Sequence, residues 1–227
     1  MSVLAHVFEA AGIATVTLAS TLSVVERTQP PRALWCDFPL GRPLGKPQDP
    51  EFQHDVLARA FALLDAESGP VLEHHPEVIK ADETPMSCQI PPAFDAEASA
   101  AVQELRGLRK AWERSFANRG ATQVGRSVEV DGIESAIAAL ESIAAGTPWK
   151  DADIPGKNTI SLVHDIRSYY EEAAMELVDG PPPAGRAAEA WFYEVTEAGK
   201  VVMAARQAIK DAEGPFPVWF YMAPGHR

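Results

Sequence analysis

The sequence has 227 residues, of which 46% are hydrophobic and 23% are charged. This length and composition are typical of a globular protein with one large domain or two small ones, and they exclude a disordered chain, a collagen and a coiled-coil fibre. Because 32 acidic residues outnumber 20 Lys and Arg, the net charge of -12 disfavours nucleic acid and anionic membrane surfaces as partners.

The first 66 residues alternate between predicted helices and strands. We expect helices at 3–11, 21–27 and 50–63, and strands at 13–18 and 32–36. Strand, helix and strand in this order predict a parallel pair with a right-handed crossover. Such a small parallel sheet leaves faces and edges uncovered. We therefore expect a second protein chain to supply the missing strands, unless the helices after residue 95 cover the sheet.

The rest of the chain changes character after residue 66. Four prolines and the lack of a sustained period predict an irregular connection over 67–95. Apolar residues at spacings of three and four then predict helices at 95–120, 131–145, 158–178 and 191–209. A short strand at 128–130 is left open. The expected fold is an α/β N-terminal part with a small parallel sheet, followed by a mostly α-helical C-terminal part over 96–227.

The N-terminal stretch and the two cysteines indicate in which cellular compartment the protein is expected. No Lys or Arg precedes Arg27, and Glu9 interrupts the apolar N-terminal stretch, so we expect no export signal and no membrane span. Cys36 and Cys88 cannot form a disulfide framework, which favours a reducing cytoplasm. The apolar tail over 215–222 should lie against this chain or another one.

Three short stretches in the N-terminal part carry a resemblance. They read FEAAGIATV at 8–16, RAL at 32–34 and FPLG at 38–41, with Gly45 and Pro47 after them. This pattern resembles the C-terminal block of selenoprotein B of glycine, sarcosine and betaine reductase, over about residues 3–66. In that family a selenolate splits the C–N bond of an amine-bearing acid such as glycine or betaine.

The catalytic part of that family is missing here. Its selenocysteine lies in a U-x-x-C-x-x-C element just upstream of the matching block, and this sequence has no cysteine before Cys36. The resemblance implies a reductase-like or lyase-like subunit that acts on a small carboxylic acid or amine-bearing compound. It carries over no catalytic residue, and the sequence indicates no particular cofactor.

The end of the second predicted strand is the first candidate site, because open α/β sheets place ligand groups there. Cys36 would be nucleophilic if Lys46 or the next helix N-terminus lowered the pKa of its thiol. The alternative is a small buried apolar side chain. The hydroxyl groups of Thr17, Ser20 and Thr21 follow the first strand and would bind a ligand or cap the next helix.

The loop from Asp37 to Pro47 is the second candidate. Gly41 and Gly45 allow the backbone to approach a ligand, and Arg42 and Lys46 offer positive charge for a carboxylate. We therefore assign Asp37, Gly41, Arg42, Gly45 and Lys46 to substrate binding. The alternative is a rigid crossover loop whose cations are only solvated.

Histidines offer two further hypotheses. The Glu73–Glu77 stretch, EHHPE, lacks metal-ligand spacing, which favours a polar loop over a metal site. His164 is a candidate catalytic residue on the third long helix, with Glu171 or Glu172 as its proton partner. The alternative is an ordinary helix surface. The aromatic residues at 169–170 and 191–193 are expected in the core.

Three functions follow from these observations. The first is a catalytic or substrate-binding subunit of a heteromeric enzyme, with Cys36 and His164 as its candidate catalytic residues. The second is a non-catalytic partner that docks onto another chain and completes it. A stand-alone metal hydrolase built on His74, His75 and His164 is the third and the least favoured.

Overall fold

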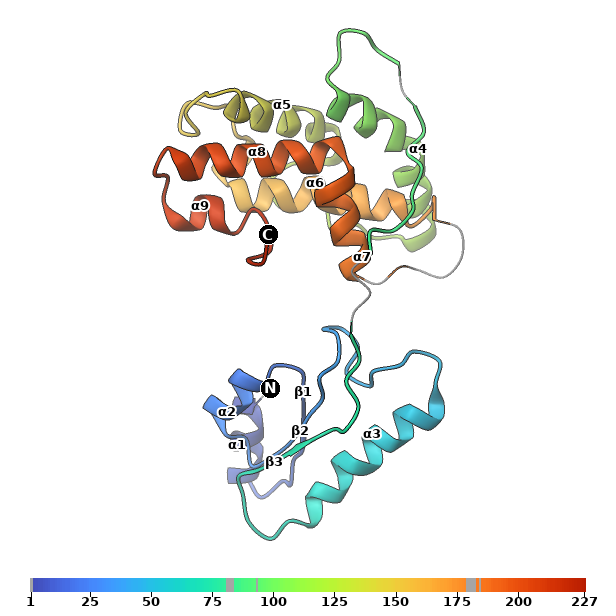
Figure 1. The fold of residues 1–227 in the computed structure, drawn as a ribbon, viewed down its shortest axis with the longest axis vertical. Helices are drawn as coiled ribbons and strands as arrows, with labels where there is room; N and C mark the ends of the chain where they lie inside the picture. Colours follow the sequence, from blue (N-terminus) through green and yellow to red (C-terminus); the bar gives the residue numbers. More distant parts are fainter. Residues whose placement is uncertain (1, 81–83, 93, 179–182, 184) are drawn as a thin grey trace. The chain divides into compact units, whose positions relative to one another are not determined.

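The computed structural model describes residues 2–80, 84–92, 94–178, 183 and 185–227. The chain forms two units, the first over Met1–Ala81 and the second over Asp82–Arg227. The first unit holds all the strands among the described residues, and the second is helical (Figure 1). The expected fold class, an α/β part followed by a mostly helical part, is confirmed.

The first unit is built around a three-stranded sheet. Its elements are α1 (Ser2–Ala10), β1 (Thr17–Ala19), α2 (Leu22–Thr28), β2 (Arg32–Trp35), α3 (Pro50–Ala62), the short 3-10 helix η1 (Leu63–Asp65) and β3 (Val71–His74). The strand order is β1-β2-β3 and both pairings are parallel, with Leu18 opposite Leu34 and Trp35 opposite His74. Helices cover both faces: α3 lies on one side, and α1 and α2 lie on the other (Figure 1).

The core of the first unit lies between β2 and α3. Leu34 and Cys36 project from one face of the sheet, because alternate residues of a strand share a face. They pack against the buried face of α3, which includes Phe52 and Val56. Asp49 starts this helix, since its carboxylate accepts the backbone N–H of Phe52 at 3.0 Å.

The resemblance residues Glu9, Thr15 and Arg32 form one polar cluster. The Glu9 carboxylate accepts the backbone N–H of Thr15 at 2.6 Å and the Arg32 guanidinium at 2.7 Å. Arg32 also donates to the carbonyl of Ala66 at 3.0 Å. The hydrogen bond from Thr15 and then the Arg32 charge hold the pKa of Glu9 below its ordinary value. This cluster ties α1 to the start of β2, so this part of the motif is structural.

Two sequence-based expectations for the first unit are wrong in detail. The stretch over 67–95 is not wholly irregular, because it contains β3, and the sheet therefore has a third strand. The side chains of β3 are mostly exposed, so the apolar pattern that identifies a buried strand is missing. The first strand covers Thr17–Ala19 rather than 13–18, and Ile13 is 56% exposed.

The second unit is a bundle of helices of unequal length. Its elements are α4 (Ala100–Arg119), η2 (Val130–Gly132), α5 (Ile133–Ala144), η3 (Pro155–Lys157), α6 (Thr159–Ala174), α7 (Gly185–Ala190), the π-helical turn η4 (Trp191–Val195), α8 (Glu197–Asp211) and α9 (Phe216–Phe220). Helix α6 packs on α4, and α5 packs on α8. Ser99 rather than Asp95 caps α4, with its hydroxyl 3.3 Å from the N–H of Val102.

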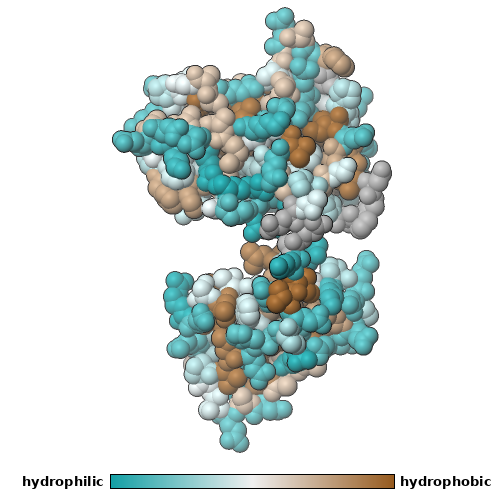
Figure 2. Space-filling model, in the orientation of Figure 1, coloured by the Kyte–Doolittle hydropathy of each residue, from teal (hydrophilic) through white to brown (hydrophobic). Residues whose placement is uncertain are grey.

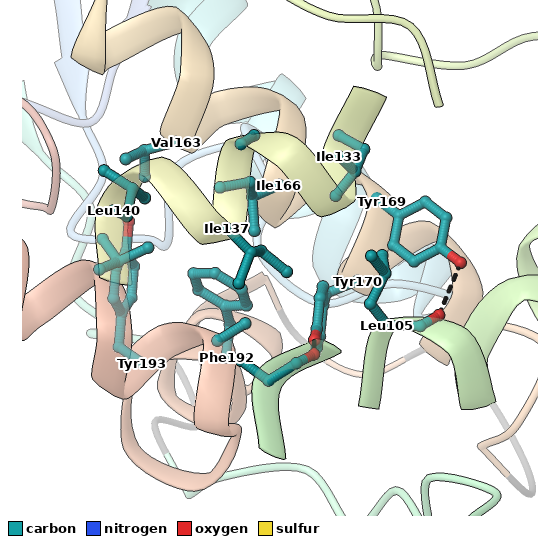
Figure 3. Packing of buried hydrophobic residues seen from close by; sticks show 14 of the residues in the cluster. Leu105, Ile133, Ile137, Leu140, Val163, Ile166, Tyr169, Tyr170, Phe192 and Tyr193 are labelled. Atoms are coloured by element: carbon teal, nitrogen blue, oxygen red, sulfur yellow. Dashed lines mark hydrogen bonds between the residues drawn. The ribbon is translucent and has the colours of Figure 1, made fainter. Parts of the chain in front are cut away.

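The core of the second unit confirms the expected aromatic cluster (Figure 3). Tyr169 and Tyr170 of α6 are fully buried, and each hydroxyl donates to a carbonyl of α4. The acceptors are Leu105 at 2.9 Å and Ala101 at 3.1 Å. These bonds satisfy the polar ends of the two side chains, so their rings can pack among the aliphatic residues of α5.

The helix predicted at 191–209 is interrupted. The π-helical turn ends at Val195, which is 49% exposed, and Thr196 starts α8 by accepting the N–H of Gly199 at 3.0 Å. A side chain at Gly199 would overlap the carbonyl of Phe192, so this close approach requires glycine. No strand forms at 128–130. The tail confirms its expected burial, since Trp219 packs against the second unit's core and Met222 is fully buried.

Candidate functional site

The carboxyl ends of the three strands form the predicted edge of the first unit. Thr17 is buried and begins β1, so it lies at the amino end of the strand and its predicted place at this edge is wrong. Ser20 follows the strand and is half-buried. Thr21 occupies the position before α2, but its side chain makes no capping hydrogen bond. Its exposed hydroxyl is thus not used by the helix, and the capping alternative does not hold for this residue.

Cys36 is buried at this edge and behaves as an apolar residue. Its residue exposure is 2%, and it lies in the cluster with Phe38 and Phe52. Its N–H donates to the carbonyl of Ala19 at 2.8 Å, which continues the pairing of β1 and β2. Burial raises the pKa of the thiol to about 11, so the thiol is protonated at neutral pH. The structure therefore favours the buried alternative over the nucleophile.

The loop over 37–47 is largely organised by its own contacts. Gly41 and Gly45 have positive φ angles of 85° and 75°, which glycine adopts without strain. Lys46 forms an ion pair with Glu77 at 2.9 Å and lies 4.2 Å from the centre of the Phe52 ring. Its charge is therefore already compensated by Glu77, whereas the rigid-loop alternative expected a cation that is only solvated.

Arg42 and Asp37 remain available in the same loop. Arg42 is half-buried, and its guanidinium makes no hydrogen bond or ion pair with any described residue. Asp37 is exposed, and its backbone carbonyl accepts the N–H of Ile79 at 2.9 Å. A small carboxylate could therefore bind at Arg42, while Asp37 holds the segment after β3 against the loop.

His75, for which the sequence predicts a polar loop, lies buried at this edge. Its side chain is fully buried between the rings of Phe38 and Phe52, at centroid distances of 5.1 and 5.4 Å. Its Nε2 lies 3.4 Å from the carboxylate of Asp55. The position directly after β3 would have indicated this burial only once β3 was known. His75 thus joins the core rather than a polar loop.

The two neighbouring histidines do not form a metal site. Within β3 and its continuation, His74 contacts the ring of Trp35 at 4.8 Å, whereas His75 lies on the face covered by α3. Successive residues of an extended chain point to opposite faces, which separates the two imidazoles. Across the described parts of the chain, no three metal-binding side chains come together.

His164 lies in the second unit, on α6. Its Nδ1 is 3.5 Å from the Ser168 hydroxyl and 3.6 Å from the Asp165 carboxylate. Burial, and then the charge of Arg126, lowers the pKa of His164. The ring is therefore neutral at pH 7, and it lines a cavity together with Arg126 and Arg167.

The expected proton partners of His164 are engaged elsewhere. Glu171 forms an ion pair with Arg167 at 2.7 Å. Glu172 is buried and accepts the indole N–H of Trp112 at 3.0 Å and the backbone N–H of Gln123 at 2.6 Å. Neither glutamate has a hydrogen bond with His164, so this pairing is wrong.

Asp165 is the residue that organises the surroundings of His164. It is fully buried and accepts four backbone N–H groups, at 2.6–3.2 Å, from residues 125–128. Burial alone would raise the pKa of this carboxyl, but the four hydrogen bonds outweigh it and hold the pKa below its ordinary value. Asp165 thus fixes the loop that carries Arg126.

Comparison of the chain with protein families, curated proteins and solved structures finds no match. None of the helices in the described ranges has both the length and the apolar character needed to cross a membrane. The two predicted catalytic residues, Cys36 and His164, belong to different units. The described residues include Arg42, a cation without an ion pair in the loop after β2, and His164, a neutral histidine in a cavity of the second unit.

Proposed function

We propose that this chain is one subunit of a heteromeric enzyme that acts on a small carboxylic acid or amine-bearing compound. In this proposal a second protein chain completes the sheet of the first unit and brings the reactive residues. The resemblance to the selenoprotein B group suggests the reaction class, in which a C–N bond is cleaved by a reductase-like or lyase-like complex.

The open sheet is the observation that carries the proposal. All described strands are parallel, and no described strand pairs with the outer edge of β1 or β3. Wholly parallel sheets are usually covered on both faces and have more than three strands. An open edge also exposes unpaired backbone N–H and C=O groups. A strand from a partner chain would satisfy these groups.

Exposed apolar side chains support docking beside β1. On α1, Val3, Leu4, Val7 and Phe8 are 45–68% exposed, and their spacing of three and four places them along one side of the helix. Ile13, just before β1, is equally exposed. Figure 2 shows apolar side chains at the surface of the first unit. Burying them would stabilise a complex through the hydrophobic effect.

The geometry favours a different chain over a second copy as the partner. Two copies related by a two-fold axis would pair their β1 strands antiparallel. A partner that continues the parallel pattern must present its strand in the same direction, which a two-fold dimer cannot do. We therefore expect a heteromer.

The state of Cys36 favours a non-catalytic role for this chain within such a complex. Because its thiol is buried and protonated, this chain would dock and bind rather than supply the nucleophile. This is the non-catalytic subunit function, and Arg42 is then its substrate-facing cation.

The test is the native mass of the particle purified through this chain, with every component identified by peptide sequencing. We expect a stoichiometric second chain that carries redox-active cysteine or selenocysteine, and Val7→Asp should release it. Phe61→Asp is the matched control, because Phe61 is 58% exposed on α3. A monomer or a homodimer that turns over substrate unaided would show the proposal to be wrong.

Activity of the reconstituted complex separates the two roles. The non-catalytic role predicts that Cys36→Ala keeps full turnover, whereas Arg42→Gln raises the KM for the acid substrate about tenfold. Loss of turnover in a correctly assembled Cys36→Ala complex would instead return Cys36 to a catalytic role.

A further inference from the structure

A cavity of about 390 Å³ lies in the second unit beside α6. Its lining residues come from the loop that carries Arg126, from α6, from η4 and from 220–225. Helix α9 packs on α6 and α8 (Figure 1). The lining includes Arg126, Arg167 and His164, and no acidic residue of the described chain belongs to it. A cationic cavity is unusual in a chain of net charge -12.

We propose that the second unit binds a small organic monocarboxylic acid, whose carboxylate lies between Arg126 and Arg167 in this cavity. The site lies wholly within the second unit. It is therefore independent of the docking proposed for the first unit and goes beyond it.

The two arginines differ in how far their charge is compensated. Arg167 forms ion pairs with Glu171 at 2.7 Å and with Glu189 at 3.8 Å, and its guanidinium lies 5.7 Å from the centre of the Tyr193 ring. Arg126 has no ion pair and no side-chain hydrogen bond with any described residue. The cavity thus has about one uncompensated positive charge, which suits a monoanion better than a phosphate dianion.

The backbone of Arg126 is held in place although its side chain is exposed. The N–H of Arg126 donates to the buried carboxylate of Asp165 at 3.1 Å, as do its neighbours in the loop. A guanidinium on a fixed backbone loses less freedom on binding than one on a mobile loop. The backbone from which the cation extends is therefore fixed before a ligand arrives.

The other side of the cavity is apolar and equally fixed. Ile160, Tyr193 and Phe220 line it. The Tyr193 hydroxyl donates to the carbonyl of Met222 at 3.1 Å, and the Thr159 hydroxyl donates to the carbonyl of Val218 at 2.6 Å. These bonds attach the C-terminal segment to α6 and η4. A preformed apolar wall next to a few polar groups is typical of small-molecule sites.

His164 adds a neutral polar group to this cavity. Its Nδ1 faces Asp165 and Ser168, so the ring orientation is set by α6 itself. A neutral imidazole can donate a hydrogen bond to a carboxylate without adding charge. This gives His164 a positioning role in ligand binding in place of the proton transfer expected from the sequence.

The test is calorimetric titration of the full chain at low ionic strength with phenylacetate, benzoate, isovalerate and hexanoate. At least one should bind saturably, and more tightly than acetate, which lacks the apolar body. The neutral isostere 2-phenylacetamide should not bind, and inorganic phosphate should bind more weakly than the best acid. Saturable binding of none of the four acids would overturn the proposal, as would preferred binding of the amide or of phosphate.

Variants locate the binding. Arg126→Gln should weaken the best acid at least tenfold, and Arg126→Glu should abolish its binding. Both changes affect an exposed side chain, so the fold is retained. Arg114→Gln is the matched control, because Arg114 is exposed on α4 and has no side-chain hydrogen bond or ion pair with the described residues. Unchanged affinity in both Arg126 variants would place the binding elsewhere and overturn the site.

Discussion

The two units of this chain differ in how completely each covers its own apolar side chains. The second is less than twice as long as the first, yet its buried cluster has 32 described residues against seven. The first also leaves a row of apolar side chains on α1 at the surface. Long amphipathic helices can bury their apolar faces against one another, whereas a three-stranded parallel sheet has edges that helices do not cover.

The units also differ in how completely their buried polar groups are hydrogen-bonded. In the second, Asp165 and Glu172 are buried with a full set of donors. Among the described residues, the first unit has three buried nitrogens without a hydrogen-bond partner, namely Nε of Arg32, Nε1 of Trp35 and Nε2 of His75. The second unit has one, Nε1 of Trp191. Unpaired buried polar groups cost stability. Among the described residues this cost falls mainly on the first unit.

A matched pair of core truncations tests this contrast most strongly. Leu140 and Leu34 are equally buried, one in each unit. Leu140→Ala should lower the free energy of unfolding of the second unit by about 4 kcal/mol, and Leu34→Ala that of the first by about 3 kcal/mol. With its small core, only the first unit should then lose protection in hydrogen exchange at neutral pH. If the amides of β2 stayed fully protected from hydrogen exchange in Leu34→Ala, the first unit would not be the less stable of the two.

The buried carboxylate on α6 gives the next effect. Asp165→Asn replaces an acceptor oxygen by an amide that faces backbone N–H groups, which should cost the second unit about 3 kcal/mol in urea unfolding. Asp153→Asn is the control, because Asp153 is exposed and has no side-chain bond with the described residues. Equal unfolding midpoints for the two variants would remove Asp165 from its organising role.

The stability of the second unit should depend on acidic pH through the ionisation of Asp165. The folded-state pKa of Asp165 is lowered, so its contribution is present above the unfolded value of about 4 and is lost as the pH falls through the lower folded value. The unfolding free energy of the second unit should therefore fall below about pH 4. In Asp165→Asn this fall should be smaller, as measured by urea midpoints between pH 2.5 and 6.

Thiol alkylation gives the smallest effect and compares the units directly. Burial raises the pKa of both Cys36 and Cys88 to about 11, so both should react slowly at pH 8 and faster as the pH rises. Cys88 is less buried and should react first. Cys36 should react only through opening of the first unit, and a bound partner should slow it further. Rapid modification of Cys36 at pH 7 would indicate an activated thiol.

The local sequence was sufficient to predict most helices and the strand β2. Their signals are short-range: apolar side chains recur at the helical period, Asp49 caps α3 and Gly120 ends α4 in a left-handed conformation. It also predicted the parallel pairing, since a helix between two strands requires a crossover. The break before α8 was missed because the spacing of apolar residues continues through Thr196.

The candidate sites were predicted less well than the elements. The sequence identified Cys36, Lys46 and His164 by residue type and position. Their states depend on distant residues: burial by α3 raises the pKa of Cys36, and Glu77 pairs with Lys46. The cavity beside α6 combines Arg126 with a tail almost a hundred residues later, so no local pattern could show it.

The sequence by itself determined the class of fold, the order of its elements and the acidic character of the chain, because these follow from composition and short-range periodicity. Only the tertiary structure decided which charges are paired, which thiol is buried, that 71–74 forms a third strand and that two arginines share a cavity with His164. The physical reason is that charge compensation and desolvation depend on groups that folding brings together. Because these groups lie far apart along the chain, no local sequence pattern predicts that they meet.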